Sequence, residues 1–358
     1  MERQWKSRPY LNGDENGLFE LYKRVYPESQ DDIEKWLKWW QWKYNDSPAG
    51  KSIIWVAEAD GIIVGQYAIV PMLLKIGADI VHGAQSLDTM TDPNYRRQGI
   101  FENLARGAFN EAKIKGINVI YGFPNEFSYP GFISKLGWHS MPRLQILFMP
   151  FNWKNTIKRK VRNKFLQITL GSAAGLFFSK LIFKAKKPPT IDGLVITRIR
   201  AFDQRFDEFW PTISNQSNIM LVRSRDYLNW RYCSPQVEFS IFTAEIDLKI
   251  CGYVVIQHKS QNGMNISNIF DVVAQSEEIL HWLIFKAIEV SKVESDLLLF
   301  SSITNNGYHK IFRRNGFLPL FFIKSGHFCL YSQAPSSSNE LLYNPKNWLV
   351  QIGDSDAA

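Results

Sequence analysis

Apolar residues near the start of the chain recur with the spacing of helices. From residue 31 to 44 they lie at every third or fourth position, which predicts a helix. Asp31 and Asp32 stand at its start, where carboxylates cap backbone N–H groups. Residues 14–26 have the same period and predict a helix before it.

After residue 50 the pattern changes to that of strands. The runs 52–58 and 62–75 are apolar and β-branched, and the Asp60-Gly61 pair between them favours a hairpin. The pattern continues with a strand over 79–90, a helix over 97–115, a buried strand over 117–123 and a short helix from about 127 to a glycine cap at Gly137. This order is typical of a mixed α/β domain, which ends near residue 150.

The second half of the chain repeats the order of the first. From Ile191 a helix, strands joined by a tight turn, a long helix, a strand and a short helix recur. Single residues recur too, since the segment 42–48 (Trp-Lys-Tyr-Asn-Asp-Ser-Pro) is echoed by 230–235 (Trp-Arg-Tyr-Cys-Ser-Pro). We therefore predict tandem copies of one fold. The predicted divisions are a first domain over 1–150, a connector over 151–190, a second domain over 191–334 and a loose C-terminal tail over 335–358.

The connector carries the excess positive charge of the chain. The protein has 358 residues and a net charge of +8, from 42 Lys and Arg against 34 Asp and Glu. Ten basic residues and no acid lie in the connector, and taking these ten from +8 leaves −2 for the rest. Its centre, 165–179, is uncharged but shorter than the roughly 20 residues that cross a bilayer. It predicts either an interfacial helix that contacts an anionic membrane through residues 154–187, or a helix that packs on the two domains.

Composition excludes several classes of protein. Hydrophobic residues make up 45% and charged residues 21%, which excludes global disorder. The three cysteines form no Cys-x-x-Cys pair and the histidines show no zinc-like spacing, so we predict no metal site, no disulfide framework and a reducing cytoplasm. Nucleic acid is not a predicted partner.

The most informative segment runs from Asp88 to Leu104. A strand leads into the turn Asp92-Pro93, and a basic loop containing Gly99 then opens a helix. Such a loop presents backbone N–H groups at the positive end of the helix dipole. This arrangement favours binding of a pyrophosphate.

With the segments that follow, this loop resembles the GNAT superfamily of acetyl-CoA-dependent N-acyltransferases. Arg96, Gly99, Asn125, Leu136 and Gly137 stand at matching positions, and the resemblance covers most of residues 10–145. It implies acetyl-CoA as acyl donor and a small amine as acceptor, held between the two domains. It implies cofactor contacts at Thr89, Met90, Arg96, Arg97, Gln98, Gly99, Ile100, Phe101, Glu102 and Asn125.

The catalytic roles that the resemblance implies are less complete. Asp88 stands where family members can carry a general base, although a strand-end carboxylate bonded to nearby backbone is an equal interpretation. Ile133 occupies the position at which a tyrosine usually protonates the CoA thiolate, so Tyr129 is the nearest candidate acid. Glu126 and His139 are further candidates. Phe101 replaces the last small residue of the loop.

The second copy lacks a cofactor loop. Ser276-Glu277-Glu278 stands at the equivalent place, where acidic side chains would repel phosphates. We therefore expect one CoA site, in the first domain, and a degenerate second domain.

Two other functions stay open. One is a Fem-type aminoacyltransferase, a family that also resembles two GNAT-like domains and uses charged tRNA. The other is a non-catalytic, CoA-sensing scaffold at the membrane. The oligomeric state and the acceptor are not specified by the sequence.

Overall fold

The computed structural model describes residues 4–152, 187–234, 237–261, 263–303, 307–320, 326–335 and 339–356. Almost all of the predicted connector lies outside these residues, so its helix and its membrane contact stay predictions. The described chain forms two compact units. Unit 1 is Met1–Pro142 with Gly326–Asn347, and unit 2 is Arg143–Ser325 with Trp348–Ala358.

Unit 1 contains the helices and strands that the apolar periods predict between residues 14 and 137, together with further short elements near its start and end that they do not predict. They are β1 (Lys6–Pro9), α1 (Glu15–Val25), α2 (Ile33–Tyr44), β2 (Ile53–Ala59), β3 (Ile62–Ile76), β4 (Asp79–Thr91), the 3-10 turn η1 (Pro93–Tyr95), α3 (Ile100–Ile114), β5 (Val119–Gly122), α4 (Tyr129–Ser134), β6 (His139–Met141), β15 (Phe328–Ser332), α11 (Asn339–Tyr343) and η4 (Pro345–Asn347). Asp32 caps α2 as expected, since its side chain accepts a hydrogen bond from the Lys35 backbone N–H.

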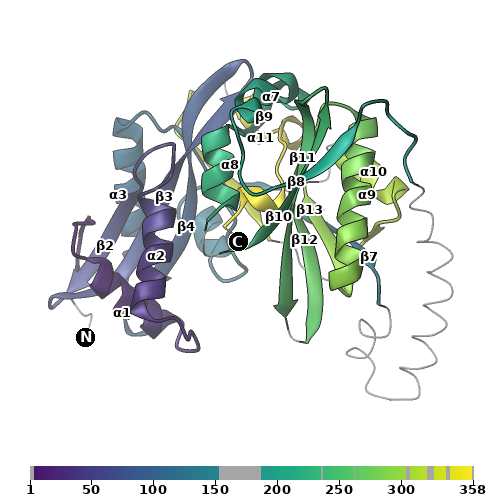
Figure 1. Ribbon diagram of the computed structural model, residues 1–358. Coiled ribbons are helices and arrows are strands. Elements are labelled where there is room, and N and C mark those ends of the chain that lie inside the picture. The colour runs from purple at the N-terminus through teal and green to yellow at the C-terminus, as the bar shows by residue number, and fades with distance from the viewer. Residues whose placement is uncertain are drawn as a thin grey trace. The chain divides into compact units, whose positions relative to one another are not determined.

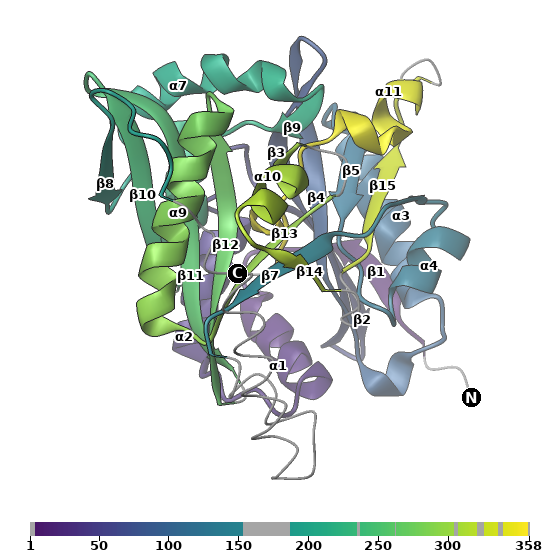
Figure 2. The ribbon, with the colours of Figure 1, turned by 90° about the vertical axis from the view of Figure 1, so that its right-hand side faces the viewer.

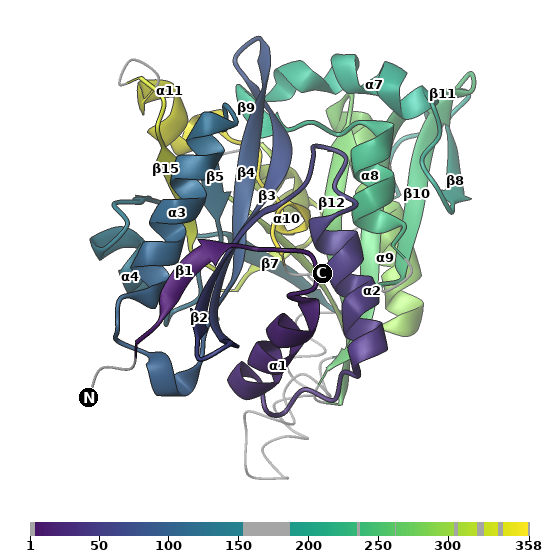
Figure 3. The same cartoon turned by 90° about the vertical axis from the view of Figure 1, so that its left-hand side faces the viewer.

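A mixed sheet forms the centre of unit 1. Its strands run in the order β1-β2-β3-β4-β5-β15-β6, and β4 and β5 are parallel. Helices α1 and α2 cover one face and α3 covers the other (Figures 1 and 3). Helix α3 approaches closely because Gly65 on β3 leaves room for Ile100, which would lie 2.6 Å from a Cβ at that position. This packing fixes the start of α3 against the end of β4.

Unit 2 repeats this arrangement. Its elements are β7 (Gln145–Pro150), β8 (Val195–Ile199), α7 (Arg205–Ile213), η2 (Ser214–Gln216), β9 (Ile219–Leu221), α8 (Arg225–Tyr232), β10 (Phe239–Ile246), β11 (Lys249–Gln261), β12 (Met264–Ala274), α9 (Glu277–Glu294), β13 (Leu297–Ser302), α10 (Tyr308–Arg314), β14 (Leu318–Pro319) and η5 (Ile352–Asp354). The sheet order β8-β10-β11-β12-β13-β7-β14 matches that of unit 1 strand for strand. The predicted duplication is thus confirmed.

Each half of the sequence contributes one strand to the sheet of the other half. β7, from the end of the first half of the sequence, pairs with β13 in unit 2, where Met149 lies opposite Leu298. β15, from the second half, pairs with β5 in unit 1, where Leu330 lies opposite Tyr121. Figure 2 shows β7 in teal among the green strands and β15 in yellow beside β5. The compact units therefore differ from the continuous ranges 1–150 and 191–334, because an apolar pattern specifies a strand but not its partner.

The C-terminal segment is packed, in contrast to the predicted loose tail. Trp348, Leu349 and Val350 are buried in unit 2. The Gln351 side chain bonds both backbone groups of Val272 on β12, accepting from its N–H at 3.0 Å and donating to its C=O at 2.9 Å. The expectation rested on the Ser-rich and Asp-rich flanks and overlooked the apolar run between them.

Candidate active site

The loop between β4 and α3 is held at its start by an ion pair with a buried carboxylate. The Asp92 carboxylate accepts a hydrogen bond from Arg24 Nε of α1 at 2.6 Å, and also caps η1 through the Asn94 backbone N–H. The Nη2 atom of Arg24 also donates a hydrogen bond to the Ile63 carbonyl at 2.6 Å. Helix α1 therefore fixes where the loop leaves the sheet.

The loop then turns through two left-handed residues. Arg97 has φ +64° and Gly99 has φ +78°, and a Cβ built on Gly99 meets no atom within 4 Å. Gly99 is the N-cap of α3 but has no side chain to bond the first-turn N–H groups of Ile100, Phe101 and Glu102. Open space, uncapped N–H groups and the positive end of a 15-residue helix thus coincide.

The side chains of the loop divide into outward and inward groups. Arg96 and Arg97 are exposed. Ile100 is buried in the core, and the Phe101 ring packs 5.4 Å from that of Phe132 on α4. Phe101 therefore contacts α4 with its ring, and its backbone N–H belongs to the first turn of α3.

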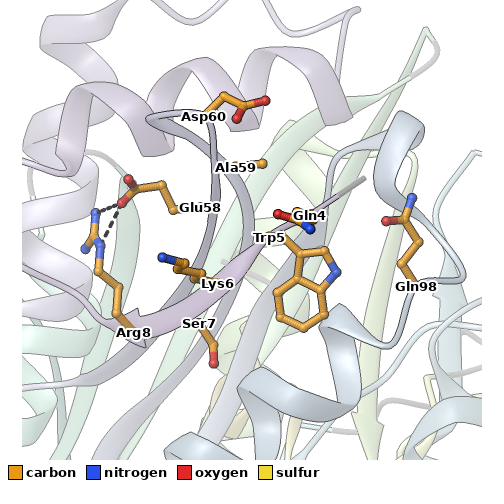
Figure 4. Close-up of a pocket in the computed structure, with 9 residues that line it drawn as sticks. All are labelled: Gln4, Trp5, Lys6, Ser7, Arg8, Glu58, Ala59, Asp60 and Gln98. Carbon is orange, nitrogen blue, oxygen red and sulfur yellow. Dashed lines mark hydrogen bonds and ion pairs between the residues drawn. The ribbon is translucent and has the colours of Figure 1, made fainter. Parts of the chain in front are cut away.

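A cavity of about 870 Å³ lies between Gln98 of the loop and the strands β1 and β2. It is lined by β1 and the residues just before it, and by the end of β2 and the turn that follows, among them Trp5, Lys6 and Asp60 (Figure 4). Arg8 in its wall is already bonded to Glu58 and Asp14. Lys6 and Arg8 are balanced by Glu58 and Asp60, so the cavity offers no net positive charge to a phosphate.

Strand β4 is irregular just before the loop. Ala68 pairs with Leu87 and Gln66 with Met90, so Tyr67 lies opposite two residues, Asp88 and Thr89. Asp88 has φ +48°, as expected at a bulge.

On the edge that faces β5, strand β4 has no paired neighbour beside the bulge. The parallel ladder with β5 ends at Ser86 opposite Gly122, and no later β4–β5 pair forms among the described residues. From Leu87 to Thr91 β4 therefore has no β5 neighbour on that edge, although the Asp88 carbonyl accepts a hydrogen bond from the Gln66 side chain at 3.0 Å.

The bulge carboxylate Asp88 has two close partners from α2. Its Oδ2 accepts a hydrogen bond from the Tyr44 hydroxyl at 2.6 Å and lies 2.6 Å from Lys43 Nζ. Within the described residues Oδ1 has no hydrogen-bond donor. The Asp88 side chain is 24% exposed, so this carboxylate is reachable from solvent.

The segment after β5 forms a second cluster. The Tyr129 ring stacks on His327 with centroids 3.6 Å apart, and its hydroxyl is 2.9 Å from Ser140 Oγ. Nε2 of His327 lies 3.5 Å from the Glu126 carboxylate. Asn125 acts locally, because its side-chain oxygen accepts from the backbone N–H groups of Phe127 and Ser128 at the start of α4.

Comparison with known proteins identifies the fold around this loop. Residues 6–141 match the family model described as acetyltransferase (GNAT) domain. These residues are a GNAT domain. No curated protein matches the sequence.

Solved structures extend the likeness of this GNAT domain to the whole described fold. A GCN5-related N-acetyltransferase from Anabaena variabilis has a TM-score of 0.62 at 13% identity, over 91% of this chain and 72% of that one. A tandem GNAT protein from the clavulanic acid biosynthesis pathway has a TM-score of 0.56 at 14% identity, over 93% and 100%. Saccharomyces cerevisiae N-myristoyltransferase with bound myristoyl-CoA has a TM-score of 0.59 at 10% identity, over 91% and 82%. At these identities the likeness shows a tandem GNAT fold and no more.

The second GNAT-like copy has the same framework without the loop. Ser276 caps α9, accepting from the Ile279 backbone N–H at 3.3 Å, so the first turn is bonded by the protein itself. Gly65 opposite Thr91 corresponds to Gly252 opposite Ala274, and counting back three residues along each strand aligns Asp271 with Asp88, although Asp271 is paired with Val255 and Asp88 lies at a bulge. The Gln351 side-chain amide bonds the backbone N–H and C=O of Val272, which is next to Asp271. Unit 2 thus has no uncapped helix start after this strand.

The sequence-predicted site residues lie in different parts of unit 1. Thr89 and Met90, with the loop residues, lie in one continuous segment next to Asp88. Tyr129 and Glu126 lie in the separate cluster with His327, and the ring of Phe101 connects the loop to α4 through Phe132. Ile133 packs against the core. His139 lies apart, stacked on Tyr343.

Sequence reasoning missed Lys43, Tyr44 and His327 as site residues. The first two could have been found, because the pair is echoed in the second copy by Arg231-Tyr232, where the Tyr232 hydroxyl donates to the strand residue Asp271. His327 offered no local signal, since it reaches this site only through the exchanged strand β15.

Two further features are relevant to the site. Among the described residues no group of three or more His, Cys, Asp or Glu side chains could hold a metal ion. In the same part of the chain no helix is long and apolar enough to cross a membrane.

Proposed function

We propose that the GNAT domain binds acyl-CoA at the start of α3 and that the protein transfers the acyl group, acetyl in the simplest case, to a small amine. The observation that supports this most is the uncapped, left-handed Gly99 between two exposed arginines and an open helix N-terminus. Backbone N–H groups there can bond the pyrophosphate, while Arg96 and Arg97 supply charge. The pantetheine arm would follow the edge of β4 that β5 leaves unpaired.

Titration calorimetry tests the donor directly. We expect one acyl-CoA bound per chain, and titration with acetyl-CoA and myristoyl-CoA in parallel reads the preferred chain length. Absence of heat with both donors would contradict the proposal. Binding without release of free CoA thiol across a library of amines would favour the non-catalytic scaffold. A requirement for charged tRNA would favour the Fem-type alternative, which no feature of the described residues specifically supports.

In the proposed reaction the amine attacks the thioester carbon and the CoA thiolate leaves. The β4 backbone at Thr89 and Met90 would bond the carbonyl oxygen, which becomes negative in the transition state. Asp88 would accept the proton of the ammonium through Oδ1, because Oδ2 is already bonded to Lys43 and Tyr44.

Tyr129 is the proposed acid that protonates the thiolate. His327 is proposed as a positioning residue, because its ring holds that of Tyr129 from one side and is itself held by Glu126. Substitution of His327 would therefore act through the orientation of the phenol.

Tyr129→Phe should lower kcat by about 10²- to 10⁴-fold while KM for acyl-CoA changes little, because the substitution removes only the hydroxyl proton. Steady-state thiol release measures both constants. Tyr343→Phe is the matched control, since Tyr343 also stacks on a histidine, His139, with centroids 4.2 Å apart. Equal kcat for both variants would remove Tyr129 from the mechanism.

A further inference from the structure

The amine that lies closest to the candidate base belongs to the protein itself. Lys43 Nζ is 2.6 Å from Asp88 Oδ2 and lies over the Trp39 ring, 4.5 Å from its centroid. A carboxylate and an aromatic face are the groups that recognise a primary ammonium. The side chain of Lys43 is only 10% exposed, so the contact is built into the fold and is not a surface ion pair.

We propose that Lys43 is an acyl acceptor, modified on its ε-amine by the acyl-CoA bound to the same chain. This inference rests on the proposed function, because it needs the donor at the β4 bulge. It goes beyond that function by assigning a covalent modification site within α2.

The comparison between the two copies supports a specific role for the amine. In unit 2 the Tyr–Asp pair is kept, since the Tyr232 hydroxyl donates to Asp271 at 3.3 Å. The residue before this tyrosine is Arg231, whose guanidinium donates to the carbonyls of Gly353 and Ser355. A guanidinium is a poor nucleophile and stays charged. A nucleophilic amine therefore accompanies this framework only in the copy with the open cofactor loop.

The chemistry balances with acyl-CoA as the sole co-reactant. The Lys43 ammonium gives one proton to Asp88, and the neutral amine forms an N–C bond to the thioester carbon while the C–S bond breaks. The thiolate takes up the second proton lost by nitrogen and leaves as CoA thiol. Asp88 returns its proton to solvent, so the products are an amide, a thiol and one proton.

The modification would change the site it occupies. An amide carries no charge, so the ion pair between Lys43 and Asp88 is lost and only Tyr44 stays bonded to the carboxylate. Asp88 would then be free to bind the ammonium of an external acceptor.

The test uses the full-length protein with deuterated acetyl-CoA, and deuterated myristoyl-CoA in parallel, followed by peptide mass spectrometry. Lys38 is the internal control, because it lies on the same helix but is exposed, and so reports non-enzymatic acylation. We expect Lys43 to acquire label at least about tenfold faster than Lys38, as proximity to a bound donor requires. Label at Lys43 no faster than at Lys38, in a protein that binds the donor by calorimetry, would overturn this inference alone.

Two variants separate the inference from its premise. Gly99→Glu, which opposes donor binding, should slow labelling of Lys43 at least tenfold and leave Lys38 unchanged. Asp88→Asn should slow it while donor binding persists, and its melting temperature checks the fold. Equal labelling of Lys43 in the wild type and Gly99→Glu would show adventitious acylation and overturn the inference. A wild type that binds neither donor would overturn the proposed function and this inference together.

Discussion

Replacing Gly99 by Glu should weaken acyl-CoA binding at least about 100-fold, a free-energy loss of about 2.7 kcal/mol. The new carboxylate would stand where the uncapped N–H groups of α3 face a pyrophosphate, and it would both repel the phosphates and compete for those donors. The variant also places a Cβ at φ +78°. Calorimetric titration with acetyl-CoA measures the effect.

A matched control removes the contribution of backbone strain. Gly116 has φ +77° and equally open space, but it lies at the opposite end of α3, about 22 Å from the loop at 1.5 Å per residue. Gly116→Glu should therefore carry the same left-handed strain and bind acyl-CoA like the wild type. Equal loss in the two variants would mean that binding responds to the strain and that the helix start is not the phosphate site.

Helices and strands were predictable from the sequence wherever one period dominated. Residues 31–44 and 97–115 have a single apolar face, and they form α2 and α3 with ends moved by a few residues. The exchange of β7 and β15 was not predictable, because both are short apolar strands that fit either sheet. Only the tertiary structure decides between these pairings.

The candidate site was predictable in its backbone and less so in its side chains. A glycine in a basic loop before a helix is a local signal, and Gly99 has a positive φ at the start of α3. The partners of Asp88 and Tyr129 are 44 and 198 residues away in sequence, on α2 and beside β15. Such contacts depend on which face each element turns to the sheet, and the spacing of residues along the chain does not encode this.

Replacing Arg223 by Met should destabilise the protein by about 3–5 kcal/mol, a large share of the 5–15 kcal/mol that stabilises a typical domain. Arg223 is completely buried in unit 2, where it bonds Asp271 on β12 and Asp354 of the C-terminal segment, each at 3.1 Å. Removing the guanidinium leaves two buried carboxylates without a cation. Urea unfolding of the full-length protein, followed by tryptophan fluorescence, measures the loss.

The pH dependence of this loss distinguishes an uncompensated charge from a simple packing defect. Burial raises the pKa of the Asp354 carboxyl and the Arg223 charge opposes this shift, so the variant should raise that pKa further. A carboxyl whose pKa is higher in the folded than in the unfolded protein favours folding when protonated, and this contribution is lost as pH rises through the folded-state value. Arg223→Met should therefore be less destabilised at pH 5 than at pH 8.

Arg225→Met provides the control at a neighbouring position. Arg225 is 42% exposed and paired with Asp226 at 3.1 Å, so its loss should cost about 0–1 kcal/mol, as for surface ion pairs in general. If Arg223→Met lost no more than Arg225→Met, or lost the same amount at both pH values, the buried carboxylates would not depend on Arg223 for compensation. The expected contrast would instead show that the ion pair of Asp271 and Asp354 with Arg223 anchors the chain end, and so keeps Gln351 on the backbone of β12 beside Asp271.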